Sequence, residues 1–286
     1  GVFGFKCFLA PSGVAEFEHV VEADLRTAMP VLADLGAPLL VHAESPAHLV
    51  TPAGGRHADW LASRPQEAEC AAIAMMIRLA RETGARVHIV HLSAIEGLPL
   101  IEAAQASGVP ITVETCPHYL AFTPEEISDH ALEFKCAPPI RGGLRPALPR
   151  IGMVISDHSP SPPDMKRGDF TTAWGGIASL ELGLAVMSTL HDSLVDLARW
   201  MAEAPARLAG IEHKGRIAPG YDADLVFFDP DERWTVQPEK LHQRHKLTPY
   251  ASRELRGRVR ATYLRGEKIY DDGEFPREPM GRVLQR

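Results

Sequence analysis

The sequence predicts an α/β fold of the TIM-type (β/α)8 barrel class, in which short parallel strands alternate with helices. Short runs rich in Val, Ile and Leu are separated by segments of helical length, which is typical of a parallel sheet covered by helices. A lysine, two histidines and an aspartate interrupt or end four of these runs. The carboxyl ends of barrel strands are where active sites are assembled. The four runs are residues 2–9, 38–42, 87–91 and 153–157.

The individual elements follow from apolar periodicity and from the residues that start and stop them. Residues 16–36 have helical spacing and end at a glycine, and residues 65–84 start near a proline and stop at a glycine. Short apolar runs between such segments are read as strands. In chain order, we expect strand 2–9, helix 16–36, strand 39–43, helix 65–84, strand 87–92, helix 95–107, strand 111–115, strand 153–157, helix 176–190 and helices 194–201 and 203–209.

The character of the chain changes at about Lys214. Residues 214–224 are rich in turn formers and lead into a short strand at 224–228. Two further strands, 259–264 and 267–270, flank a turn at Arg265-Gly266. We therefore expect residues 1–213 to form the barrel portion and residues 214–286 to form a small β-sandwich portion and tail.

Size and composition exclude several classes of function. With 286 residues, 45% of them hydrophobic, the chain can bury one large core and a small appendage. A net charge of -7 gives no basic surface for nucleic acid or anionic membrane. Four scattered cysteines without CxxC spacing indicate reduced thiols in a cytoplasmic protein. The chain shows no signal-peptide pattern and starts within a strand-like run, so we expect it to be part of a longer protein.

Two histidines are the leading candidates for metal ligands. A single histidine at a strand end is more often a structural polar residue than a ligand. His42 and His91, however, stand at equivalent ends of consecutive predicted strands, and this repetition favours ligation of Zn²⁺ or a similar ion. His88, on the second of these strands, is expected to be structural.

Asp157 and Lys6 are the other two candidates. Asp157 could cap a helix or form a turn, but the tip of a buried strand favours a metal-bound carboxylate that also accepts a proton from water. An ammonium group repels cations, so Lys6 fits as a ligand only if CO2 adds to its amine and forms a carbamate. Phenylalanines on either side of Lys6 make a purely solvent-seeking lysine a poor alternative.

These residues resemble the cyclic amidohydrolases of the amidohydrolase superfamily, which include dihydropyrimidinase, hydantoinase, dihydroorotase and allantoinase. The resemblance implies an incomplete (β/α)8 barrel with strands 4 to 8 present. Carboxylated Lys6 would lie on strand 4, with His42 ending strand 5, His91 strand 6 and Asp157 strand 8. The motifs that carry it are residues 4–6, 41–44, 90–93 and 156–158, together with the return to a β-sandwich domain at 220–225.

Several further stretches are similar to the allantoinases within that group. The implied reaction is metal-dependent hydrolysis of allantoin to allantoate in purine catabolism, with Asp157 as general base. The resemblance also implies two divalent metals (Zn, or Co, Mn or Fe), a homo-oligomer (the family's tetramer) and a small-molecule substrate bound by backbone groups near Ala137 and Gly175. The stretches are residues 114–120, 135–141, 173–178, 200–206 and 248–250.

Two departures from the family keep other functions open. The His-x-His pair of strand 1 is absent, and the segment between Arg141 and Ile155 is shorter than the family's. A hydantoinase or dihydropyrimidinase, or a non-catalytic truncated scaffold, are the alternatives. A scaffold has no use for Lys6 as a metal-ready lysine. We expect the 286 residues alone to be catalytically poor, because one metal would keep too few ligands.

Overall fold

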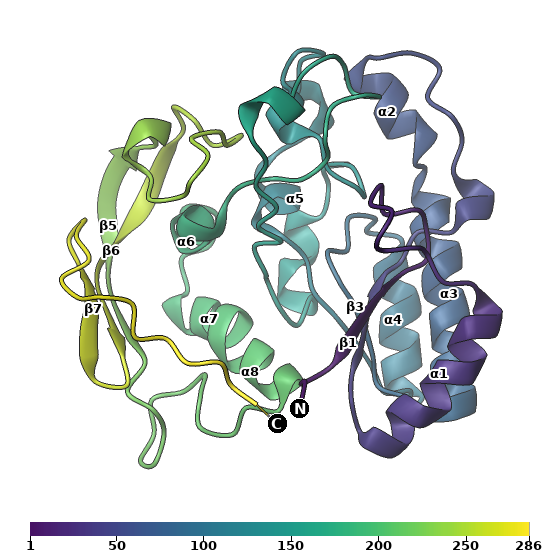
Figure 1. The fold of residues 1–286 in the computed structure, drawn as a ribbon, viewed down its shortest axis with the longest axis horizontal. Coiled ribbons are helices and arrows are strands. Elements are labelled where there is room, and N and C mark those ends of the chain that lie inside the picture. Colours follow the sequence, from purple (N-terminus) through teal and green to yellow (C-terminus); the bar gives the residue numbers. More distant parts are fainter. Residues whose placement is uncertain (286) are drawn as a thin grey trace. The chain divides into compact units, whose positions relative to one another are not determined.

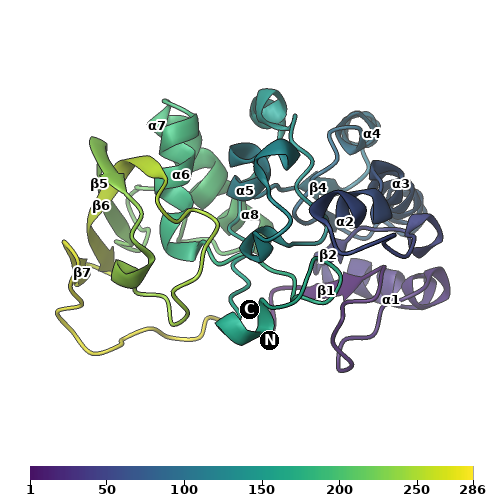
Figure 2. The ribbon, with the colours of Figure 1, turned by 90° about the horizontal axis from the view of Figure 1, so that it is seen from above.

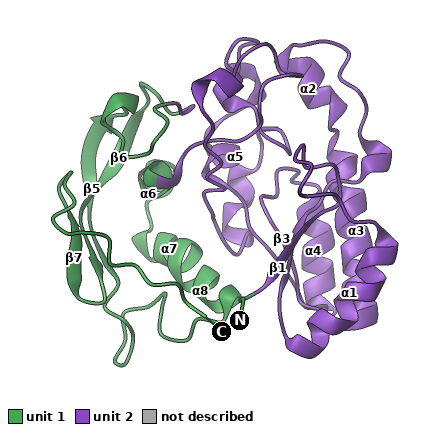
Figure 3. Ribbon diagram, in the orientation of Figure 1, with its two compact units in different colours: residues 1–3, 181–246, 250–286 green, residues 4–180, 247–249 purple. Residues whose placement is uncertain are grey.

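The structure is a computed structural model that describes residues 1–285, and the chain forms two compact units. Unit 2 comprises residues 4–180 and 247–249, and unit 1 comprises residues 1–3, 181–246 and 250–286 (Figure 3). A four-stranded sheet lies in unit 2 and a three-stranded sheet in unit 1. The two units are groups of residues that pack together. The expected division into a barrel portion (1–213) and a β-sandwich portion (214–286) stays a prediction.

The sheet of unit 2 is parallel, and its strands follow one another in chain order. Each strand pairs with the next through a short register, so the carboxyl ends of all strands lie at one edge. β1 is an edge strand, because only β2 pairs with it among the described residues. The strands are β1 (Phe5–Phe8), β2 (Leu39–His42), β3 (Val87–Ile89) and β4 (Ile111–Val113).

Helices α1 (Glu22–Leu35), α3 (Gln66–Thr83) and α4 (Gly97–Ala106) connect the strands and lie on the same side of the sheet (Figures 1 and 2). This one-sided arrangement is the barrel type of α/β packing, because a doubly wound fold places helices on both faces. The short helix α2 (His57–Ser63) precedes α3. Apolar side chains at helical spacing form the core between helices and sheet; they include Leu25, Met29, Leu32, Ala72, Ile73, Met76, Leu79, Leu98 and Ile101.

The chain after β4 is less regular than predicted. The expected strand at 153–157 is reduced to one parallel bridge, between Thr115 and Val154. At its C-terminal end the strand cannot extend through Asp157, which adopts a positive φ of 44°. At its N-terminal end it is limited by a 3-10 turn (Arg145–Arg150). The prolines of that turn disfavour a longer helix. Helix α5 (Pro117–Ala121) lies between β4 and this region.

Unit 1 combines short helices with an antiparallel sheet. The helix expected over 176–190 starts only at residue 183, because Gly176 has a φ of 127° and Ile177 forms a parallel bridge with His158. The strands expected in the tail are present, and the first two are longer than predicted. The elements are α6 (Gly183–Leu190), α7 (Leu194–Ala198), a π-helical turn (Arg199–Glu203), α8 (Ala204–Ala209), β5 (Leu225–Thr235), β6 (Glu254–Leu264) and β7 (Glu267–Asp271).

In the part of the chain that the structure describes, we find no helix with the length and apolar character needed to span a membrane.

His242 of unit 1 gives a pH-dependent contribution to stability. Its Nδ1 lies 2.7 Å from Glu181 Oε1 and its Nε2 lies 3.0 Å from the Gly273 carbonyl oxygen. Because both partners are acceptors, both ring nitrogens must carry protons. The hydrogen bond to Glu181, followed by that to Gly273, raises the pKa of His242.

We therefore expect the His242→Gln variant to lose more stability at about pH 5.5 than at about pH 8.5. A raised folded-state pKa gives stabilisation that is fully present below the unfolded value and is lost as pH rises through the folded value. The loss should be about 1 kcal/mol or less, as for other partly exposed pairs. Urea unfolding at both pH values measures it, with the exposed His19→Gln as control. An equal loss at the two pH values would contradict the expectation.

Candidate metal centre

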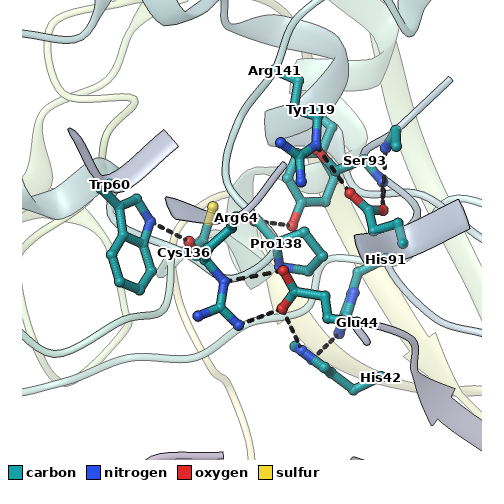
Figure 4. Close-up of polar contacts among 12 residues, drawn as sticks. His42, Glu44, Trp60, Arg64, His91, Ser93, Tyr119, Cys136, Pro138 and Arg141 are labelled. Atoms are coloured by element: carbon teal, nitrogen blue, oxygen red, sulfur yellow. Dashed lines mark hydrogen bonds and ion pairs between the residues drawn. The ribbon is translucent and has the colours of Figure 1, made fainter. Parts of the chain in front are cut away.

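His42 and His91 come together at the carboxyl edge of the parallel sheet. His42 is the last residue of β2 and His91 follows β3 by two residues. Both side chains are buried, and His42 Nδ1 lies 3.1 Å from His91 Nε2 (Figure 4). Two nitrogen ligands of one tetrahedral zinc ion are separated by roughly 3.3 Å, given Zn–N bonds of about 2.05 Å. The separation of these nitrogens therefore suits two ligands of one ion.

A buried carboxylate and an arginine orient His42. His42 Nε2 lies 2.7 Å from Glu44 Oε2, and Arg64 contacts both oxygens of Glu44, with Nε at 3.0 Å and Nη2 at 2.5 Å. Burial alone would raise the pKa of Glu44, but the hydrogen bond from His42 and the charge of Arg64 lower it to about 2. An ionised Glu44 can only accept, so His42 Nε2 carries the proton. The lone pair of His42 therefore sits on Nδ1 and faces His91.

His91 is neutral and held in an unusual backbone conformation. Burial, and then the charges of His42 and Lys6, keep its pKa well below the usual value. Its φ is 43°, in the left-handed region, which costs of order 1–3 kcal/mol for a residue with a side chain. Its Nδ1 is buried and has no hydrogen-bond partner within residues 1–285. A neutral, strained imidazole with an unpaired ring nitrogen beside a second histidine fits a binding site.

Lys6 lies on the same side of β1 as Phe8, near the two histidines. Its Nζ is 5.0 Å from the centre of the Phe8 ring, and that ring is 5.1 Å from the ring of His42. Contrary to the expectation from its phenylalanine neighbours, Lys6 is exposed, because β1 is an edge strand. As an ammonium it lowers the pKa of His91, so a cation could approach only if the amine lost its charge.

Asp157 approaches the site from the segment that bridges to β4. Its φ of 44° is also left-handed, so the backbone is strained at His91 and Asp157 alike. Burial raises the pKa of the Cys116 thiol well above its usual value. The charge of Asp157 raises this pKa further, whereas the charge of Lys6 lowers it. The charges of Asp157 and Lys6 therefore both act on the same buried thiol.

His42 and His91 have the spacing of two ligands of one metal ion, whereas the four candidate ligands together do not form a compact group. In the described chain, no group of three or more His, Cys, Asp or Glu side chains could hold a metal ion between them. A site would need Lys6, which is not of those residue types, as a further ligand. The structure thus brings His42 and His91 together and leaves Lys6 and Asp157 on the same side of the sheet without direct contact to them.

Two loops near the site contain the predicted substrate contacts, Ala137 and Gly175. They are joined by a hydrogen bond of 2.8 Å from the Gly176 N–H to the Lys135 carbonyl oxygen. Lys135 Nζ donates to the carbonyl oxygens of Thr171 and Ala173, and Lys166 Nζ donates to that of Gly176. Burial lowers the pKa of both lysines to about 8.

A small hollow of about 10 Å³, roughly the space of one water molecule, lies beside the second loop. Gly176 and Lys166 form part of its wall, and so does Ser159, two residues after Asp157. The hollow adjoins Gly176, the residue after the predicted Gly175 contact. Its other lining residues are Glu133, Ser161, Ala178 and Leu247.

His88 is structural, as expected from the sequence. It is fully buried, with Nδ1 2.7 Å from Thr112 Oγ1 and Nε2 2.9 Å from Glu114 Oε2. Both of its ring nitrogens are used within the sheet, so neither is available as a ligand. Sequence reasoning did not identify the groups that support the candidate ligands. One signal was present: Glu44 follows His42 by two residues, a spacing that puts both side chains on one face of an extended chain.

His118 was also not identified. It is fully buried, and neither ring nitrogen has a hydrogen-bond partner in the described part of the chain. Burial lowers its pKa to about 4, against the opposing charge of Asp157, so the ring is neutral.

Comparison with known proteins identifies the class to which this fold and site belong. The family model described as the amidohydrolase family matches residues 12–269. The chain belongs to the amidohydrolase family, a family of hydrolases whose solved neighbours have a TIM-barrel α/β fold. Membership implies a divalent metal.

Within that family the chain is allantoinase-like. It is 49% identical to the allantoinase of Streptomyces avermitilis over 300 residues, which cover 100% of this chain and 67% of that protein. It is 41% identical to the allantoinase of Saccharomyces cerevisiae, over 99% of this chain and 66% of that protein. The chain thus spans about two thirds of the length of these relatives.

Solved structures with the same fold are hydantoinases. The L-hydantoinase (dihydropyrimidinase) from Arthrobacter aurescens matches 97% of this chain and 67% of its own with a TM-score of 0.91 and 30% identity. The D-hydantoinase (dihydropyrimidinase) from Thermus sp. matches 97% and 66% with a TM-score of 0.85 and 26% identity. The fold is therefore shared with the hydantoinases, while sequence identity is higher to the allantoinases.

The buried Glu44–Arg64 pair leads to a stability prediction. Arg64→Met should cost about 3–5 kcal/mol at neutral pH, because it leaves an ionised carboxylate buried without a cation. Arg56→Met is the matched control, since the Arg56 side chain is 68% exposed and its pair with Asp59 should contribute little to stability. Urea unfolding of both variants checks this. Equal losses in the two variants would show that burial of the Arg64 pair has no special effect.

Proposed function

We propose that this chain hydrolyses a cyclic amide and that the reaction is the opening of allantoin to allantoate. One observation carries the proposal: His42 Nδ1 and His91 Nε2 face each other at 3.1 Å in a chain whose curated relatives are allantoinases. A hydantoinase or dihydropyrimidinase activity is the alternative, suggested by the solved neighbours. Assays of allantoin, dihydrouracil and simple hydantoins with the same preparation separate the two.

The proposal includes the barrel position of each strand. β1, β2, β3 and β4 correspond to strands 4, 5, 6 and 7 of a (β/α)8 barrel, and the segment at Val154 corresponds to strand 8. Support comes from the parallel order of the four strands and from the bridge between Thr115 and Val154. The antiparallel sheet of unit 1 is the β-sandwich portion.

In this proposal Lys6, His42, His91 and Asp157 hold the metal. The two histidines fit, because His42 Nδ1 and His91 Nε2 face each other at 3.1 Å and imidazole nitrogens are preferred zinc ligands. Lys6 fits as a carbamate: its ammonium loses a proton, the free amine nitrogen forms a bond with the carbon of CO2 and loses a second proton, and the group becomes an anionic oxygen donor. The proposed ions are zinc, with Co, Mn or Fe as substitutes. When bound, a divalent cation polarises an amide carbonyl and lowers the pKa of water.

The chain's own residues then have separate roles in ring opening. Asp157 accepts the proton of the attacking water and returns it to the ring nitrogen as the carbon–nitrogen bond breaks. Backbone groups at Ala137 and Gly175 hydrogen-bond the amide edges of the ring and orient its carbonyl. The hydrogen bond between the two loops and the ammonium groups of Lys135 and Lys166 support this assignment, because they hold the backbone of the two loops.

We also propose a cytoplasmic homo-oligomer, with a tetramer as the family resemblance suggests. The four cysteines form no disulfide, which suits a reducing compartment.

Replacement of Asp157 tests the general base. Asp157→Asn should keep the fold but lower kcat for allantoin on the order of 10²-fold or more. Asp164→Asn changes an exposed aspartate seven residues further on and serves as control. Steady-state kinetics at saturating metal, together with circular dichroism, gives the comparison. Activity within a few-fold of the unchanged protein would place the base elsewhere.

Replacement of Lys6 tests the carbamate. Protein prepared with bicarbonate should contain divalent metal, and Lys6→Ala should contain much less, because an anionic oxygen donor is lost. Lys240→Ala removes an exposed lysine of unit 1 and should leave the metal content unchanged. Elemental analysis after dialysis measures the content. Equal metal in Lys6→Ala and the unchanged protein would refute the role of Lys6.

A further inference from the structure

Glu69 is a buried carboxylate that joins two segments far apart in the sequence. It lies in the first turn of α3, and its side chain is 3% exposed. Its Oε2 accepts hydrogen bonds from the backbone N–H groups of Ser93 and Ala94, at 3.0 and 3.1 Å. Its Oε1 accepts a hydrogen bond of 3.0 Å from Arg141 Nε. One side chain thus contacts the backbone that follows His91 and the end of the segment 135–141.

The backbone that follows His91 needs such a support. His91 has a left-handed φ, and its ring position depends on where the next residues are held. The two hydrogen bonds to Glu69 fix the direction of the chain at Ser93 and Ala94. Leu92 N–H, which donates to the Glu114 carbonyl oxygen at 2.8 Å, completes the attachment.

Segment 135–141 is attached to the same support. Ser93 Oγ donates to the Pro139 carbonyl oxygen at 2.6 Å, and Tyr119 Oη donates to that of Pro138 at 2.7 Å. Figure 4 shows the contact between Tyr119 and Pro138 near the histidine pair. The segment contains Ala137, so the support of one candidate ligand is also the support of a candidate substrate contact.

A second, parallel connection runs from His42 to the same segment. Glu44 contacts both His42 and Arg64. The Arg64 guanidinium lies over the Trp60 ring, 5.1 Å from its centre. Trp60 Nε1 in turn donates a hydrogen bond of 3.0 Å to the Cys136 carbonyl oxygen. Both histidines are therefore linked through a glutamate–arginine pair to segment 135–141. The connection from His91 has fewer steps, because the single carboxylate of Glu69 contacts both the backbone after His91 and Arg141.

We propose that Glu69 is a positioning residue that couples metal binding at His91 to the conformation of segment 135–141. The inference deepens the proposed function and rests on it for the identity of the metal and substrate contacts. Coupling of this kind is reciprocal: a metal that fixes His91 orders the segment, and an ordered segment favours the metal.

The test uses Glu69→Gln, which keeps the size of the side chain but has only one acceptor oxygen. Either the Ser93–Ala94 backbone or Arg141 must then lose its partner. We expect zinc affinity, measured by competition with a chromophoric chelator, to fall by about 10–100-fold, as for other groups that orient metal ligands. Glu67→Gln, which changes an exposed carboxylate in the same turn of α3, should bind zinc as the unchanged protein does.

Hydrogen–deuterium exchange of segment 135–141 supplies the second readout. Zinc should slow exchange there in the unchanged protein and in Glu67→Gln. In Glu69→Gln the slowing should fall by about threefold or more, within the range that coupling through contiguous contacts produces. Unchanged zinc affinity, or full zinc-dependent slowing, in a folded Glu69→Gln protein would overturn the proposal. A loss of unfolding stability with both readouts unchanged would show that Glu69 is structural only.

A second variant keeps the proposal testable if Glu69→Gln does not fold. Arg141→Lys keeps a positive charge and leaves the bonds from Ser93 and Ala94 to Glu69 intact. It should bind zinc within about threefold of the unchanged protein yet lose zinc-dependent slowing in segment 135–141. Retained slowing would overturn the proposal. Neither readout uses allantoin, so absence of allantoin hydrolysis with intact zinc coupling would count against the proposed function and not against the role of Glu69.

Discussion

The parallel pairing of β1 to β4 is the constraint on which the site depends. Because each strand pairs in register with the next, the residues that end or follow the strands gather at one edge of the sheet. His42 and His91 meet there although 49 residues separate them in the chain. The helices between the strands are needed to return the chain to the start of the next strand, and they lie on the same side of the sheet. A shift of one residue in β2 would move His42 to the other face.

Charged groups buried behind the histidines make this edge chemically specific. Glu44 and Glu69 are both inaccessible, and each is paired with an arginine that is itself mostly buried. A buried ion pair is a poor source of stability, because desolvation offsets its attraction. Its advantage here is geometric: Glu44 fixes the proton of His42 on Nε2, and Glu69 fixes the backbone after His91. Burial raises the pKa of Glu69 against the opposing charge of Arg141, so its ionised form depends on that arginine.

Much of the fold was predictable because its elements are local and periodic. The helix at α3 is bounded by Pro65 and Gly84, both of which are visible in the sequence. The helix expected from residue 176 was wrong at its start, because a positive φ at Gly176 and a bridge at Ile177 depend on long-range pairing. The prediction of a strand at 153–157 was also wrong beyond Val154, because its pairing depends on residues far away in the sequence. The histidine pair could be predicted from strand-end positions, whereas Glu69 and Arg141 could not, since their contacts join segments 72 residues apart.

The central claim is that His42 and His91 bind one metal ion through Nδ1 and Nε2, respectively. X-ray diffraction from crystals of the zinc-loaded protein, recorded on both sides of the zinc absorption edge, tests it most directly. The account predicts an anomalous peak between these two nitrogens, at about 2.0–2.1 Å from each. A peak elsewhere, or ligation through His42 Nε2 or His91 Nδ1, would contradict it.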